Sequence, residues 1–138
     1  MEVTAIHTNE LLAGKEDNYF SDREEYFLLA SAPPVKMHFN VEYATSKLNV
    51  NLRANYFGAI NLINYSVEEY TYSPKTTLDA SIGYDITSNM HLTIGGTNLL
   101  NTYPDDTDPY ETETGGAWDA VQMGFNGLFM YSKLGFKF

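Results

Sequence analysis

Apolar and polar residues alternate along five segments of the chain. In each segment the apolar side chains fall on every second position, which is the pattern of a β-strand with one apolar and one polar face. A shift of one residue would turn the apolar side chains to the polar face, so the pattern also specifies the register of strand pairing. The five segments run from Val35 to Tyr43, Leu48 to Tyr56, Leu78 to Ile86, Met90 to Thr97 and Leu128 to Phe138.

The stretch from Asn126 to Phe138 is typical of a membrane-spanning strand. Its apolar face has one polar exception, Ser132, and its polar face carries the aromatic residues Phe129 and Tyr131. The five segments are roughly eight to eleven residues long, whereas soluble strands have a mode nearer five or six and a tilted membrane strand needs about nine to eleven. Strand length therefore favours strands that cross a bilayer.

The connections between the segments are of two kinds, which alternate along the chain. Residues 45–47 and 87–89 are tight turns of small polar residues, whereas the links 58–75 and 100–125 are long. This alternation puts both turns at one end of the sheet and both long links at the other, the asymmetry that outer-membrane barrels show. Irregular loops of this length are uncommon in compact soluble domains.

The first third of the chain is less regular. Residues 2–8 fit the end of another strand, and Ser21 to Glu24 has the Ser-x-x-Glu pattern of a helix N-terminus, which predicts a short helix at about 22–29. Pro33 and Pro34 would end that helix. The predicted fold is therefore all-β: an antiparallel up-and-down meander of five to six long strands, forming an open segment of a large transmembrane β-barrel.

Composition narrows the function classes. The chain is 43% hydrophobic and 14% aromatic, which is not the composition of a disordered protein. Its net charge of −10 argues against a nucleic-acid-binding surface, which needs a basic patch, and the absence of cysteine excludes disulfides and cysteine-based sites. No apolar run is long enough for a transmembrane helix, which barrel strands do not require. No signal peptide is visible, so either the export signal lies on a longer parent protein or the membrane interpretation is wrong.

A family resemblance adds to this picture. The segment Leu92 to Asp105, with Asn98-Leu99-Leu100-Asn101 and then Tyr103, resembles a motif near the C-terminus of TonB-dependent receptors, in which phenylalanine is commoner than leucine at position 100. Glu113 to Gly116 and Gln122 to Gly127 look like the last external loop and the start of the final strand in Bacteroidota-type members. The resemblance extends from about residue 10 to the end of the chain.

The resemblance implies that residues 1–138 form the C-terminal part of the β-barrel of an outer-membrane receptor that takes up a nutrient. Barrels of this family have about 22 strands and a plugged lumen, and this chain supplies five or six strands without the plug domain. The implied partners are outer-membrane lipid, the rest of the barrel and plug, and TonB only through the plug. The barrel-insertion machinery is a further implied partner, for which Leu134, Phe136 and Phe138 resemble the insertion signal. No cofactor is implied.

Ligand contacts are expected in the external loops. The acidic loop 105–113 is the densest charge cluster, and we interpret it as a solvated, mobile loop in preference to a divalent-cation site, because it lacks the regular spacing of a calcium loop. Tyr110 and Trp118 are the candidate ligand contacts. His7, His38 and His91 lack metal-ligand spacing, and no catalytic constellation is present, so we predict neither a metal site nor an enzyme.

The polar strand faces and strand ends have more ordinary interpretations. Arg53, Lys133 and Lys137 are expected to line the lumen and to pair with acidic residues of the same face. Asn98 is expected to cap the bend between strand and loop. Aromatic residues near strand ends on the apolar face fit the interfacial girdles of membrane barrels. The acidic partners are Glu42, Asp79 and Asp85, and the girdle residues are Tyr43, Tyr56, Tyr84 and Phe138.

Two other hypotheses remain. The chain could be a soluble antiparallel β-barrel of lipocalin type that binds a small apolar ligand, since alternation alone permits it. It could also be a non-functional gene fragment. Recovery of a monodisperse monomer without detergent would favour the first of these two, and the reading frame upstream of Met1 bears on the second.

Overall fold

The computed structural model describes residues 24, 26, 28, 33–63, 68–112, 115–118 and 122–138. Within these residues the fold is all-β, as predicted. The strands are β1 (Lys36–Ala44), β2 (Leu48–Phe57), β3 (Ile60–Ile63), β4 (Glu69–Tyr72), β5 (Lys75–Thr87), β6 (Met90–Thr97) and β7 (Phe129–Phe136), and η1 (Pro109–Glu111) is a 3-10 helix.

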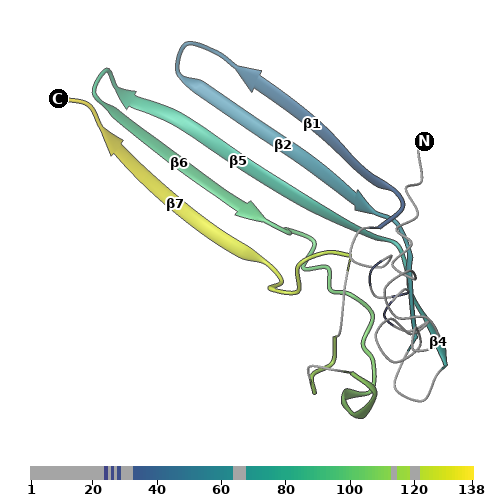
Figure 1. Cartoon of the computed structure of the whole chain (residues 1–138). Helices are drawn as coiled ribbons and strands as arrows, with labels where there is room; N and C mark the ends of the chain where they lie inside the picture. The colour runs from purple at the N-terminus through teal and green to yellow at the C-terminus, as the bar shows by residue number, and fades with distance from the viewer. Residues whose placement is uncertain are drawn as a thin grey trace, which may run out of the picture.

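Five of these strands form one open antiparallel sheet in the order β1-β2-β5-β6-β7, with β1 and β7 at its edges (Figure 1). Neighbours in the sheet are neighbours among the long strands of the chain, so the predicted up-and-down meander is confirmed. β6 has the predicted bounds, and β5 begins at Lys75 rather than at Leu78. Strands β3 and β4 pair only with each other, as a short hairpin between β2 and β5.

The two ends of the sheet differ as the connections predicted. The turns between β1 and β2 and between β5 and β6 lie at one end, where β7 also finishes, and the long connections lie at the opposite end (Figure 1). The structure changes one detail, because the link 58–75 is not irregular. It holds the β3–β4 hairpin, and Lys75 already belongs to β5.

The strand register aligns the apolar positions into continuous rows across the sheet. One row runs through Val41, Leu52, Ala80, Gly96 and Met130, and the next through Tyr43, Val50, Ile82, Ile94 and Ser132. The residues between these rows form the polar face, so Ser132 lies on the apolar side and Tyr131 on the polar side, as predicted. β5 carries a bulge at Ile86, between Asp85 and Thr87.

The apolar face is exposed, whereas the buried core lies elsewhere. Phe39, Ile82 and Ile94 on this face are 69%, 54% and 51% exposed. The buried hydrophobic cluster among the described residues consists of Ile60, Leu62 and Tyr72, all in the β3–β4 hairpin. The core of the described chain is therefore at the loop end and not under the sheet.

Two expectations fall largely outside the described residues. Of the helix expected at about 22–29, Glu24, Tyr26 and Leu28 are described, and all three are α-helical. The strand expected at residues 2–8 lies outside the described residues. In the part of the chain that is described, no helix is long and apolar enough to cross a membrane.

Candidate functional site

The long connections fold together at one end of the sheet into a unit that we call the cap. It comprises the described residues of 58–74 and 98–128. Its largest buried side chain, Tyr72, is 1% exposed, and the Tyr72 hydroxyl hydrogen-bonds the Thr107 hydroxyl at 2.8 Å. The Tyr70 hydroxyl donates to the backbone carbonyl of Asp106 at 2.8 Å. The β3–β4 hairpin is thereby joined to the chain that follows β6.

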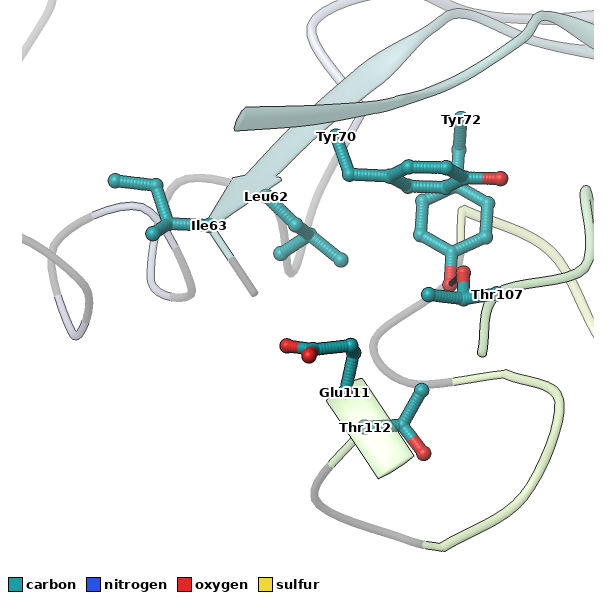
Figure 2. Close-up of a pocket in the computed structure, with 7 residues that line it drawn as sticks. All are labelled: Leu62, Ile63, Tyr70, Tyr72, Thr107, Glu111 and Thr112. Atoms are coloured by element: carbon teal, nitrogen blue, oxygen red, sulfur yellow. Dashed lines mark hydrogen bonds between the residues drawn. The ribbon is translucent and has the colours of Figure 1, made fainter. Parts of the chain in front are cut away.

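Figure 2 shows the interface between these two parts, with Leu62, Ile63, Tyr70 and Tyr72 of the hairpin on one side and the region around η1 on the other. Tyr70 and Tyr72 meet edge to face at 5.0 Å between ring centroids. The cavity they leave is about 10 Å³, which is the volume that one water molecule requires. The interface is therefore a packing contact and not a ligand pocket.

Asn98 begins the last connection and has a left-handed backbone, with φ of 50°. Its side-chain oxygen accepts from the Thr102 amide at 2.9 Å and its side-chain nitrogen donates to the Thr102 carbonyl at 2.8 Å. Asparagine tolerates this conformation better than most residues. Asn101 has the same combination of a left-handed backbone and a side-chain hydrogen bond: its φ is 52°, and its side-chain oxygen accepts from the Leu128 amide. The prediction that Asn98 caps the bend is confirmed.

Asp105 ties the acidic loop to the base of the hairpin. Its carboxylate forms an ion pair with Lys75 and accepts the Ser73 amide at 2.5 Å. Partial burial acts to raise the pKa of Asp105, but the hydrogen bonds from Lys75 and Ser73 outweigh it and lower the pKa from 3.8 to about 2. The expectation of a solvated, mobile loop is therefore wrong at this residue.

The remaining acidic residues of the loop do not converge. The Asp108 carboxylate accepts the Tyr110 amide at 3.0 Å and so caps η1. Among the described residues, no group of three or more His, Asp or Glu side chains lies close enough to hold a metal ion. Glu113 lies outside the described residues.

The two candidate ligand contacts have different environments. Tyr110 is 92% exposed on η1 and is not among the residues that line the hollow beside Trp118. Trp118 stacks with Tyr103 at 5.9 Å and with Phe125 at 5.4 Å between ring centroids. Stacking on two neighbouring rings gives Trp118 a structural role in the cap. Tyr110 and Trp118 are therefore not brought together into one site.

A wide, open hollow adjoins this aromatic stack. It has a volume of about 610 Å³ and is lined by Tyr103, Pro104, Asp105, Asp106 and Trp118. Trp118 and Tyr103 have much of their ring surface occupied by stacking, and Asp105 is paired with Lys75. In this hollow, part of the aromatic surface and the Asp105 carboxylate are therefore already used in contacts within the cap.

The polar face of the sheet holds a hydrogen-bond network that the sequence did not single out. The Asn55 side-chain nitrogen donates to the Thr77 hydroxyl at 3.1 Å and to the Asp79 carboxylate at 3.0 Å. The other Asp79 oxygen accepts the Asn98 amide at 2.9 Å, and His38 bonds the Asn55 side-chain oxygen at 2.8 Å. Alternation predicted that these residues share a face, but it gave no signal that Asn55 and Thr77 are buried.

The ion pairs expected on the polar face are not the ones that form. The Asp85 carboxylate lies 2.6 Å from the His91 ring, and the Glu42 carboxylate accepts from Asn49 at 3.0 Å. Within the described chain Arg53, Lys133 and Lys137 form no ion pair with Glu42, Asp79 or Asp85. The expectation of these pairs is wrong, because neighbouring neutral donors and His91 take the carboxylates.

The predicted insertion-signal residues lie at the edge of the sheet. Leu134 and Phe136 project from the apolar face of β7 and are 50% and 60% exposed. Phe138 follows the strand and is fully exposed. Their role as an insertion signal stays a prediction.

No family model matches this chain, and comparisons with curated proteins and with solved structures find no match.

Proposed function

We propose that the chain is a wall segment of a transmembrane β-barrel in the cell outer membrane, the C-terminal part of a TonB-dependent receptor. In this role it contributes wall strands and external loops to nutrient uptake and performs no covalent chemistry. The observation that carries the proposal is the exposed apolar face, which continues in register across all five strands of the sheet.

The dimensions of the strands support a bilayer as the partner of this face. β1 has 9 residues and β5 has 13. Nine residues at about 3.3 Å each extend roughly 30 Å, and a tilt of about 40° leaves roughly 23 Å along the membrane normal, close to the apolar band of outer-membrane barrels. A soluble sheet of this size would instead cover the face with a second layer.

The distribution of aromatic residues also supports the proposal. Tyr84 and Phe136 lie on the apolar face nearer the turn end of the sheet than Ile82 and Ile94 do, and they are 46% and 60% exposed. Aliphatic residues such as Ile82 and Ile94 occupy the middle of the same face. An aromatic border beside an aliphatic band is the arrangement of side chains at a membrane interface.

A matched pair of lysine substitutions tests the proposal. Leu52 lies on the apolar face and its neighbour Asn51 on the polar face of the same strand. In lipid, Leu52→Lys puts a charge into the apolar band, at a cost of about 2–4 kcal/mol near the midplane. Asn51→Lys leaves that band unchanged.

The readout is the detergent bound per protein after purification of the full chain, together with its flotation with outer-membrane lipid vesicles. We expect Leu52→Lys to lower both and Asn51→Lys to leave both unchanged. Recovery of a monodisperse, detergent-free monomer for the unmodified chain, with Leu52→Lys without effect, would show that the face needs no lipid. The second candidate, a soluble barrel that holds an apolar ligand, is not favoured by the described strands, because their main sheet is open with β1 and β7 at its edges.

A further inference from the structure

The polar face of the sheet contains a cavity where β2, β5 and β6 meet the cap. Its volume is about 220 Å³, below the usual range for drug-sized ligands and suited to a single side chain or a small ion. Asn55, Thr77 and Asn98 line it and are each only 8% exposed. The cavity is thus built from buried polar side chains held by their own hydrogen bonds.

Asp79 gives this cavity its electrostatic character. It is the only carboxylate among the residues that line the cavity, and those residues include no cation. Arg53 is its register partner on β2, but no ion pair forms between them in the described chain. Each Asp79 oxygen accepts one hydrogen bond, from Asn98 or from Asn55, so further lone pairs remain.

We propose that this cavity binds the guanidinium group of an arginine side chain supplied by another polypeptide segment. A guanidinium is planar, weakly hydrated and carries five donors, so it can meet several acceptors around the Asp79 carboxylate at once. Phe57 and Met123, which also line the cavity, offer apolar contact to its alkyl stem. A divalent cation is a poorer fit, since a single carboxylate contributes.

The source of the arginine rests on the proposed function. In a barrel the polar face is the lumen face, so the segment that reaches Asp79 would belong to a domain that fills the lumen. The chemistry of the cavity does not depend on the membrane. The two proposals can therefore fail separately: vesicle flotation tests the wall, and the titration described next tests the cavity.

The test is a titration of the full chain in detergent micelles with two peptides. Binding is monitored through the side-chain amide signals of Asn55, Asn98 and Asn126 in nuclear magnetic resonance spectra. The probes are acetyl-Gly-Arg-Gly-amide and its citrulline counterpart, a neutral isostere of the arginine peptide. We expect saturable shifts of these signals with the arginine peptide. The citrulline peptide should bind at least about tenfold more weakly, because it cannot form a charge-assisted hydrogen bond. Equal shifts from both peptides would overturn the proposal.

Variants locate the site. Asp79→Asn should weaken binding of the arginine peptide about tenfold, and Asp85→Asn, at a carboxylate paired with His91, should leave it unchanged. Because Asp79 also accepts the Asn98 amide, Asn126→Ala at the exposed rim serves as a second variant that spares this network and should weaken binding several-fold. Unchanged binding in both Asp79→Asn and Asn126→Ala would place the peptide elsewhere.

Two further arms identify the source. Methylguanidinium should bind no more tightly than the arginine peptide, and a clear preference for methylguanidinium would overturn a polypeptide source. Arg53→Gln should leave affinity unchanged. A several-fold gain in that variant would mean that Arg53 fills the cavity, which would overturn an external segment as the occupant.

Discussion

At the scale of single residues, Asn98 fixes the point where the sheet ends and the cap begins. It combines a left-handed backbone with two side-chain hydrogen bonds to Thr102 and a backbone hydrogen bond to Asp79. An alanine can provide neither the two side-chain bonds nor a low-cost left-handed backbone. One side chain therefore joins the cap to the polar face of the sheet.

This gives a prediction on stability. Asn98→Ala should lower the free energy of unfolding by about 2–3 kcal/mol, the sum of two hydrogen bonds and the left-handed strain. Asn98→Gly should cost less, because glycine accepts a positive φ without strain. Denaturant titration in micelles measures both, with Asn126→Ala as a neutral control. Equal costs for alanine and glycine would show that the backbone conformation contributes nothing.

Asp105 gives a second prediction at the residue scale. Because its pKa falls from 3.8 to about 2 on folding, its contribution is complete above about pH 4 and is lost as the pH falls through 2. For a partly exposed pair we expect about 1 kcal/mol. The amide signal of Ser73, which donates to Asp105, should titrate with a pKa near 2.

Asp105→Asn should abolish this titration, while Asp106→Asn, one residue away, should leave it unchanged. A Ser73 amide that titrates near 3.8 in the unmodified chain would contradict the ion pair with Lys75.

The roles of some of these residues are predictable from the sequence and those of others are not, for a physical reason. Asn98 was predictable because capping is a local interaction within a short motif. The ion pair of Asp105 with Lys75 was not predictable, because it forms between two segments that only the fold brings together. The burial of Asn55 depends in the same way on the cap covering one end of the polar face.

At the scale of elements, the length of a strand decides whether the alternation of apolar and polar residues is enough to predict it. The long strands of the main sheet repeat the pattern often enough to be predicted, and their turns follow from small polar residues. β3 and β4 have only 4 residues each, too few for a periodic signal, so the hairpin was predicted as loop. Its stability comes from side chains that meet across the cap.

The hairpin and the last connection should therefore unfold together. Leu62→Ala removes a side chain that is 4% exposed in the cap core and should cost about 2–4 kcal/mol. Hydrogen exchange should show lost protection both at β3–β4 and at residues 102–112, with β5 and β6 unchanged. Loss confined to the hairpin would contradict a shared core.

At the scale of the whole molecule, charge and apolar surface are separated. Of the described acidic residues, only Glu42, Asp79 and Asp85 belong to the five-stranded sheet, and most of the others lie in the cap. One face of the sheet is apolar and exposed, and one end of the molecule is acidic. A bilayer satisfies both features if the cap stays in water, because the acidic end would avoid the apolar layer.

The open sheet sets the limit on what the chain can do alone. β1 and β7 each present one unpaired edge, and an unsatisfied backbone group in hydrocarbon costs several kcal/mol. Four antiparallel pairings separate β1 from β7. Because this number is even, the two strands run in the same direction and cannot close on each other as an antiparallel pair. The smallest membrane barrels use about eight strands.

We therefore predict that the isolated 138-residue chain associates with lipid vesicles without inserting stably as a monomer. Its strands should remain accessible to protease, and its electrophoretic mobility should not change on heating. A protease-resistant, heat-modifiable monomer in vesicles would contradict this prediction, because it would require five strands to satisfy their edges without a partner.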